Sequence, residues 1–329
     1  MSALLGLGVQ EAALLGAVRS GRYHHAWLLA GPKGVGKASF ADAAARRLLA
    51  ETAGPPPEGE GLALSPDHPT ARLIEAGSHP DLARLSRLAR EKTGDLARNI
   101  SVDQVRSLQR LFATAPSFSP LRVVVIDALE DLEAPAANAL LKNLEEPPTG
   151  TLFLLVSHVP GRLLPTIRSR CRLLRFPLLD DALVTRVLKG ALPEVSDAEI
   201  AALVRVGEGA PGRALHFAGL DIGGLDQMMT RLLTEGDATG TTRSTLAQTL
   251  SLRSAQARYE AFLERVPARI AAEARVAVGP RRAVALALWE KARDLAGGAV
   301  PLSLDPQATV FELAGYLAAL APDGKAAKA

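Results

Sequence analysis

Short apolar runs alternate with helix-like stretches in the first half of the chain. Residues 26–30 (AWLLA) form one run that ends just before a glycine, and a helix-compatible stretch follows over 37–50. Two further runs, 123–126 and 152–156, are separated by the helix-like sequence AANALLKNLEE. Short runs of this kind are typical of buried parallel strands. Over residues 1–177 the alternation predicts an α/β domain, a parallel sheet with helices on both faces.

The second half of the chain predicts helices only. Residues 178–221 contain short helical stretches broken by Gly and Pro, and we expect them to form a small helical domain. From 222 to 322 apolar residues recur at helical spacing, which predicts a helical bundle. A Pro- and Gly-rich stretch at 51–69 predicts a loop insertion, and the tail 323–329 is expected to fray.

The amino-acid composition argues against several functional classes for this chain. With 48% apolar and 22% charged residues the chain can bury substantial cores, and with 4% aromatics it does not suit a base-stacking platform. The net charge of +3 comes from 38 basic and 35 acidic residues that are interspersed, which argues against a protein that binds DNA by itself. The single cysteine, Cys171, excludes an intrachain disulfide and a cysteine-based zinc cluster.

Nothing in the hydropathy pattern predicts a membrane partner. No stretch approaches 18 uninterrupted apolar residues, and the first residues lack the positively charged segment of a signal peptide. The chain is therefore predicted to be cytoplasmic.

Residues 31–37 (GPKGVGK) fit the G-x-x-x-x-G-K pattern of a P-loop, a phosphate-binding loop placed here between a predicted strand and a predicted helix. Gly31, Gly34 and Gly36 would let backbone N–H groups close around phosphate oxygens, and Lys37 would add a point charge. The start of the helix contributes its positive dipole. ATP or ADP is the ligand that this pattern suits.

The usual protein ligand for Mg²⁺ is missing after the loop. A Ser or Thr hydroxyl is expected there, but the position is Ala38, and Ser39 is turned by about 100° along the helix. Asp127, at the end of a predicted strand, suits the second metal-site carboxylate. Two interpretations stay open: weak nucleotide binding, or a loop kept for its fold alone.

Two segments resemble the clamp-loader branch of the AAA+ proteins: AANALLKNLEEPP (136–148) and the SRC triplet (169–171) after PTIR. RSGRYHHAWLLAGPKGVGKASFA (19–41), SHPDL (78–82) and GAPGRAL (209–215) are similar to the pattern of the delta-prime subunits of bacterial DNA polymerase III. The resemblance is clear over about residues 1–217. It implies an AAA+ fold for residues 1–177, a helical lid domain for 178–221 and a helical collar for oligomerisation for 222–322.

The resemblance implies roles for three side chains. Arg170 of the SRC triplet would reach into a neighbouring subunit and act as an arginine finger on its ATP. Ser157 would be a polar sensor at a strand end, and Arg213 a second sensor in the lid. Each has a plainer interpretation: an ion pair or cap within the chain for Arg170, a strand-end cap for Ser157, and an exposed helix residue for Arg213.

The resemblance also implies partners. These are a gamma/tau-type clamp-loader ATPase and a delta subunit, with the sliding clamp and primer-template DNA reached through the complex. Membership of a polymerase complex would not make the chain a polymerase, because it has no recognisable polymerase metal-site signature.

The chain departs from the ATPase members of this branch. Active AAA+ ATPases carry a glutamate after the strand-end aspartate, where this chain has Ala128, and Glu130 is expected by spacing to point elsewhere. Together with Ala38 this predicts poor or absent ATPase activity. Residues 51–80 contain no cysteine, and His68 and His79 suit surface or capping roles better than a zinc site, so no zinc is expected.

Some motifs and alternatives remain. Glu145 and Glu146 followed by Pro147 and Pro148 suit a helix stop better than acid/base chemistry, and His24 and His25 are expected to be structural. An active gamma/tau-like ATPase is the main alternative function. A solitary P-loop kinase or helicase would leave the SRC triplet and LLKNLEEPP unexplained.

Overall fold

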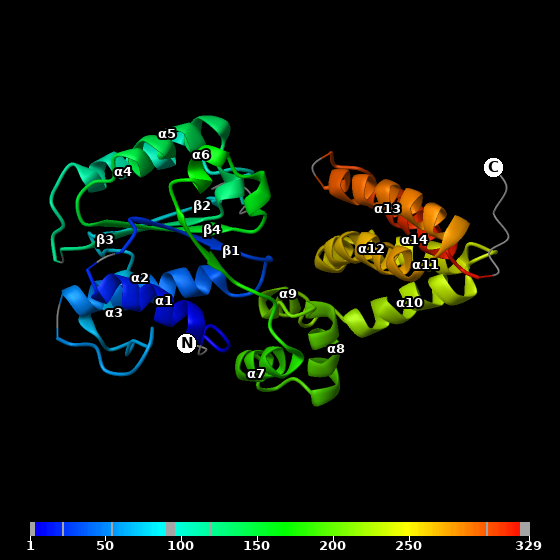
Figure 1. Ribbon diagram of the computed structural model, residues 1–329. Coiled ribbons are helices and arrows are strands. Elements are labelled where there is room, and N and C mark those ends of the chain that lie inside the picture. The colour runs from blue at the N-terminus through cyan, green and yellow to red at the C-terminus, as the bar shows by residue number, and fades with distance from the viewer. Residues whose placement is uncertain are drawn as a thin grey trace. The chain divides into compact units, whose positions relative to one another are not determined.

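The computed structural model describes residues 4–21, 23–53, 55–89, 96–118, 120–300 and 302–322 (Figure 1). Contacts along the chain divide it into two compact units, Met1–Leu215 and His216–Ala329. The predicted division into AAA+, lid and collar domains at 177 and 221 stays a prediction, and the tail 323–329 lies outside the described residues.

A parallel sheet of five strands, in the order β2-β3-β4-β1-β5, forms the centre of the first unit. In the three inner strands nearly every residue is buried, because helices cover both faces. Pairing of β1 with β4 brings Ala30 opposite Ser157, which sets the two strand ends side by side. The strands are β1 (Ala26–Ala30), β2 (Leu82–Ser86), β3 (Arg122–Asp127), β4 (Thr151–Ser157) and β5 (Arg172–Arg175).

Helices lie on both faces of this sheet, so the predicted α/β fold class is confirmed (Figure 1). One hydrophobic cluster joins the sheet to the first group of helices, and a second cluster joins it to the other group. The first group is α1 (Gly8–Arg19), α2 (Lys37–Thr52) and α3 (Pro69–Glu75); the second is α4 (Val102–Phe112), α5 (Ala134–Glu145) and α6 (Pro165–Arg168).

Local sequence explains where several of these helices begin and end. Ser101 and Gln104 form a reciprocal capping box at the start of α4, and the His68 ring accepts a hydrogen bond from Thr70 N at the start of α3. The helix α5 ends at Glu145, so the predicted helix stop before Pro147 is confirmed. Short 3₁₀ turns, η1 (Leu129–Asp131) and η2 (Pro160–Arg162), follow β3 and β4.

The remainder of the chain is helical, as the apolar spacing predicts. The first unit ends with α7 (Asp181–Ala191), α8 (Asp197–Gly207) and the start of α9 (Pro211–His216). None of the helices in the described part of the chain has the length and apolar character needed to cross a bilayer. The second unit contains α10 (Ile222–Glu235), α11 (Thr241–Leu250), η3 (Arg253–Ala255), α12 (Gln256–Val276), α13 (Gly279–Ala299) and α14 (Pro306–Ala318).

Candidate functional site

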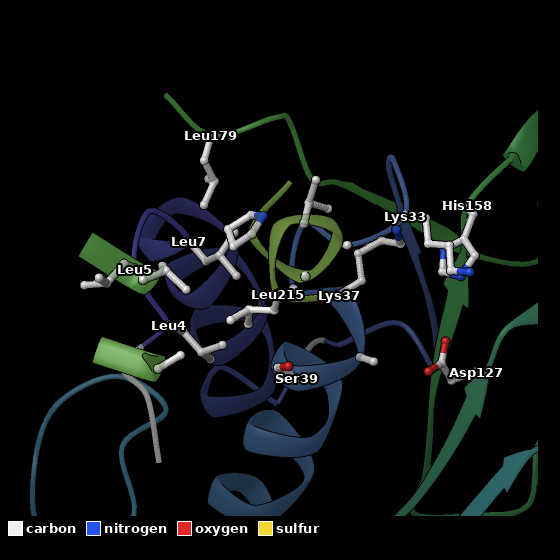
Figure 2. Close-up of a pocket in the computed structure, with 18 residues that line it drawn as sticks. Leu4, Leu5, Leu7, Lys33, Lys37, Ser39, Asp127, His158, Leu179 and Leu215 are labelled. Carbon is white, nitrogen blue, oxygen red and sulfur yellow. The ribbon is translucent and has the colours of Figure 1, made fainter. Parts of the chain in front are cut away.

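The predicted phosphate loop borders a cavity of about 370 Å³ at the carboxyl ends of the strands (Figure 2). The loop joins β1 to α2, and Gly36 is the N-cap of α2 with φ 96°. Figure 2 shows leucines 4, 5, 7, 179 and 215 on one side of the cavity and Lys33, Lys37, Asp127 and His158 on the other. An apolar wall facing a cationic loop is an arrangement that suits a nucleotide, with its base on the leucines and its phosphates on the loop.

Two loop glycines are required by packing as well as by phosphate geometry. A Cβ on Gly31 would lie 2.1 Å from the Phe176 carbonyl oxygen, at the end of β5. Gly34 has φ +86°, and a Cβ there would lie 2.7 Å from the Arg213 backbone nitrogen in α9. The Gly212 N–H donates to the Gly34 carbonyl at 2.8 Å. These glycines therefore let the loop pack directly against β5 and α9.

Lys37 is buried, and its ammonium is held by the loop itself. Its Nζ donates to the carbonyl oxygens of Gly31 and Pro32, both at 2.6 Å. Burial lowers the pKa of Lys37 to about 8, although the nearby carboxylates of Asp127 and Glu130 act to raise it. A bound phosphate would offer this amine a stronger, charged acceptor than the two carbonyls.

Asp127 lies at the end of β3 and faces the cavity, as the sequence predicts. Burial raises the pKa of its carboxyl group, while His158 and Lys37 act to lower it. His158, which the sequence analysis did not single out, also lines the cavity, and burial followed by the charge of Lys37 lowers its pKa. Its place directly after the strand-end Ser157 is the signal by which it could have been found.

The hydroxyl group of Ser157 has a hydrogen-bond partner within the chain that the sequence did not predict. Its hydroxyl donates to Glu130 Oε1 at 2.5 Å, and the same oxygen accepts the backbone N–H groups of His158 and Val159. Burial acts to raise the pKa of Glu130, but these hydrogen bonds outweigh it and the net pKa is lowered. Glu130 is not one of the residues that line the cavity. The turn η1 folds the chain back, so its carboxylate joins the ends of β3 and β4.

Ala38 and Ser39 both line the cavity, from the first turn of α2. Ala38 presents a methyl group where a metal-binding hydroxyl is expected, and the Ser39 hydroxyl remains within the lining in spite of the helical turn. Among the described residues, no group of three or more His, Cys, Asp and Glu side chains is placed to hold a metal ion.

Arg213 lies beside the phosphate loop, but its side chain forms an ion pair with a residue close to it in the sequence. It lies in α9, and its Nη1 contacts Glu208 Oε2 at 2.7 Å. Its neighbours Pro211, Gly212 and Leu215 line the cavity. The structure therefore brings the backbone of the predicted second sensor to the loop, while its guanidinium forms an ion pair with the Glu208 carboxylate.

Arg170 lies outside this cavity, between α6 and β5. Its Nη2 forms an ion pair with Glu145 Oε1 at 2.8 Å, and its Nη1 donates to the Thr166 carbonyl at 3.0 Å. The side chain is still 35% exposed. The next residue, Cys171, is unsuited to thiolate chemistry because burial raises its pKa to about 12.

The histidines that the sequence assigned structural or capping roles form hydrogen bonds with nearby backbone groups. The His24 and His25 rings stack with centroids 4.4 Å apart, and the His25 Nε2 donates to the Leu144 carbonyl at 3.0 Å. His68 and His79 each accept a nearby backbone N–H through Nδ1. For His68 this is the predicted capping role, because it is the N-cap of α3. Both are buried, so a surface location for them is wrong.

Known proteins resemble the part of the chain that carries these features. A family profile described as DNA polymerase III, delta subunit, matches residues 10–180. DNA polymerase III subunit delta' of Pseudomonas aeruginosa is 36% identical over 201 residues, 60% of this chain and 58% of that protein. The Escherichia coli delta' subunit is 34% identical over 203 residues, 61% and 57% of the two chains. The matched part thus spans less than two thirds of these relatives.

Two further likenesses extend beyond that region. The tau subunit of Escherichia coli DNA polymerase III is 32% identical over 264 residues, 78% of this chain and 38% of tau. A solved gamma subunit-related protein from Thermotoga maritima covers 93% of this chain and 98% of its own, with 16% identity and a TM-score of 0.43, too distant to carry an argument. From the profile match and the delta' identities, the chain belongs to the DNA polymerase III delta subunit family, in its delta-prime branch.

Proposed function

We propose that this chain works in the cytoplasm as a delta-prime-like subunit of a DNA polymerase III clamp loader. Its Arg170 acts in trans, as an arginine finger on ATP bound by a neighbouring ATPase subunit. The observation that carries the proposal is the position of this guanidinium, which stays 35% exposed and lies outside the chain's own nucleotide cavity. A side chain so placed is available to a site on another subunit.

The chemistry of an arginine finger explains why such a residue matters. Charge develops on the γ-phosphoryl oxygens during hydrolysis, and a guanidinium delivered by a neighbour stabilises it by a factor of about 10³–10⁵ in well-studied GTPases. The planar fork of Arg offers several N–H groups to such oxygens, which a lysine does not. The contacts with Glu145, Thr166 and Ser169 engage the two terminal nitrogens, Nη2 and Nη1, while the guanidinium stays partly exposed.

The chain's own cavity is proposed to bind ATP or ADP weakly and to hydrolyse ATP poorly or not at all. Ala38 offers no metal-binding hydroxyl, and Ala128 offers no carboxylate to orient water. Ser157, the proposed sensor, donates its hydroxyl to Glu130. Arg213, the proposed second sensor, is paired with Glu208. Of four positions that serve catalysis in an active AAA+ site, two thus lack the functional group and two carry side chains that are bonded to other residues of the chain.

The proposed partners follow from the family. They are a gamma/tau-type ATPase and a delta subunit, with the second unit of this chain contributing to a helical collar. The sliding clamp and primed DNA are contacted through the complex, since the near balance of 38 basic and 35 acidic residues gives this chain little attraction for DNA of its own.

One observation favours a second candidate, an active gamma/tau-like ATPase. The likeness to tau reaches over 78% of this chain, more than the delta' matches cover. Against it stand the alanines at 38 and 128, and the single cysteine, which cannot build the zinc module of the ATPase subunits.

The deciding experiment is ATP turnover by the reconstituted complex of this chain, its ATPase and delta partners, clamp and primed DNA. Arg170→Ala should lower turnover roughly 10²–10³-fold while the complex still assembles. Arg168→Ala is the matched control, because it removes an exposed arginine two residues away and should leave turnover unchanged. If Arg170→Ala has no effect and Lys37→Ala abolishes hydrolysis by the isolated chain, the second candidate is correct.

A further inference from the structure

We propose that Glu145 is a positioning residue for Arg170, holding the guanidinium in the orientation in which it meets a neighbour's phosphate. The inference rests on the proposed function and assigns a role to the last residue of α5, for which the sequence suggested only a helix stop. The ion pair joins Glu145 Oε1 to Arg170 Nη2 at 2.8 Å. It links two segments that lie 25 positions apart in the sequence but side by side in the fold (Figure 1).

Two acceptors fix the orientation of the Arg170 fork. Nη2 is held by Glu145, and Nη1 donates to the Thr166 carbonyl at 3.0 Å and reaches Ser169 Oγ at 3.5 Å. An arginine tethered at both terminal nitrogens loses most of its rotamer freedom before it meets its target. Because it remains 35% exposed, this order is reached without burying the group that must contact phosphate.

Glu145 and Arg170 each lie close to a residue that is buried in the hydrophobic core. Leu144, next to Glu145, is 1% exposed, and its carbonyl accepts a hydrogen bond from His25 in the segment before β1. On the other side, Ile167 is 2% exposed and belongs to the same hydrophobic cluster as Leu144. The distance between the acid and the arginine is therefore set by a shared core.

A purely structural role explains this acid poorly. An ion pair with both side chains exposed, 35% for Arg170 and 48% for Glu145, contributes little to folding stability. A carboxylate at the carboxyl end of a helix is also disfavoured by the helix dipole, and Glu145 is the last residue of α5. Glu145 supplies the one carboxylate that the structure pairs with Arg170 among the described residues.

The test uses the reconstituted complex and five variants of this chain. Glu145→Gln keeps the shape of the side chain and removes its charge, and it should lower kcat about tenfold with KM for ATP unchanged, because a misplaced group costs rate rather than ground-state binding. Glu146→Gln, the same change on the next, exposed residue, should match the wild type. Adding Glu145→Gln to Arg170→Ala should cause no further loss, since the acid acts only through the arginine.

The outcomes separate the inference from the proposed function. A silent Arg170→Ala overturns both. A damaging Arg170→Ala with a Glu145→Gln variant at or above wild-type turnover overturns the positioning role alone. Equal losses from Glu145→Gln in the wild-type and Arg170→Ala backgrounds also overturn it, because the acid would then act by another route. Charge reversal in Glu145→Lys should lower kcat further than Glu145→Gln, and unchanged assembly and melting of each variant exclude misfolding.

Discussion

At the scale of single residues, we expect any nucleotide binding by this chain to depend on Lys37. In the free protein its ammonium is buried and rests on two carbonyl oxygens of its own loop. A pKa of about 8 means that it loses its charge within the range where proteins are commonly studied. Phosphate oxygens would favour the charged form, so binding at high pH must take up a proton.

Nucleotide affinity is therefore expected to fall as the pH rises above 8, by up to about tenfold per pH unit, because one proton is linked to binding. Calorimetric titration with ADP at pH 7, 8 and 9 measures the effect. Lys37→Met keeps the length of the side chain without its charge, and its residual affinity should not change over this range. Equal dependence in both proteins would show that another group is responsible.

Restoring a hydroxyl at position 38 should restore metal dependence. Ala38→Thr is expected to tighten ATP binding several-fold when Mg²⁺ is added, whereas the wild type should show little change on adding the metal. Hydrolysis should stay low because Ala128 is unchanged. Ser39→Ala is the control, since Ser39 also lines the cavity. Mg²⁺-dependent binding by the wild type that is lost in Ser39→Ala would mean that Ser39 holds the metal.

Sequence alone could locate the parts of the candidate site that one short motif specifies. The loop with Lys37 and the strand-end Asp127 lie where their patterns predict, on one cavity. The ion pair of Glu145 with Arg170 and the hydrogen bond of Ser157 to Glu130 were not predictable. Each joins residues more than 20 positions apart, and only the packing of elements brings such side chains together.

At the scale of helices and strands, only strands that are buried on both faces can be predicted from their sequence pattern. The strands β1, β3 and β4 are covered on both faces, so their apolar runs are continuous. The edge strands β2 and β5 each bury a single residue fully and carry arginines, so they resemble surface segments. Their place in the sheet comes from pairing with β3 and β1 rather than from their own pattern.

The contact of the phosphate loop with α9 gives a prediction at this scale. Gly34→Ala places a methyl group 2.7 Å from the Arg213 nitrogen at a φ of +86°, so it should lower the free energy of unfolding by about 1–3 kcal/mol and weaken nucleotide binding. Gly16→Ala in α1 meets open space and should raise the free energy of unfolding by up to about 1 kcal/mol. Urea unfolding of the variants measures both changes. Equal stability of Gly34→Ala and wild type would show that the loop moves away from α9 without cost.

For the whole molecule, three histidines link folding to pH. Burial is the first cause that lowers the pKa values of His25, His79 and His158 in the folded chain, so the unfolded chain binds more protons below its histidine pKa of about 6.5. Stability should be complete above that pH and decline as the pH falls below it.

Urea unfolding at pH 7.5, 6.5 and 5.5 should accordingly show a midpoint that is slightly lower at pH 6.5 than at pH 7.5 and clearly lower at pH 5.5. The pKa values of Glu51 and Glu130 are lowered in the folded chain, so these carboxylates reduce stability only at pH values well below 5.5. They therefore do not account for a loss of stability at pH 5.5. His79→Asn keeps an acceptor for the Asp81 N–H and should reduce the decline. An unchanged midpoint at pH 5.5 would show that these rings carry the same charge in the folded and the unfolded chain.

The edge strand β5 has a consequence for the behaviour of the chain at high concentration. Its outer side is open, and an open strand is a template on which further chains can add. Arg172 and Arg175 place like charges at both ends of this strand, and Gln10 already occupies the Arg175 carbonyl through a hydrogen bond of 2.8 Å. We therefore expect copies of the chain to repel each other at this edge, which would keep the neighbouring segment with Arg170 accessible.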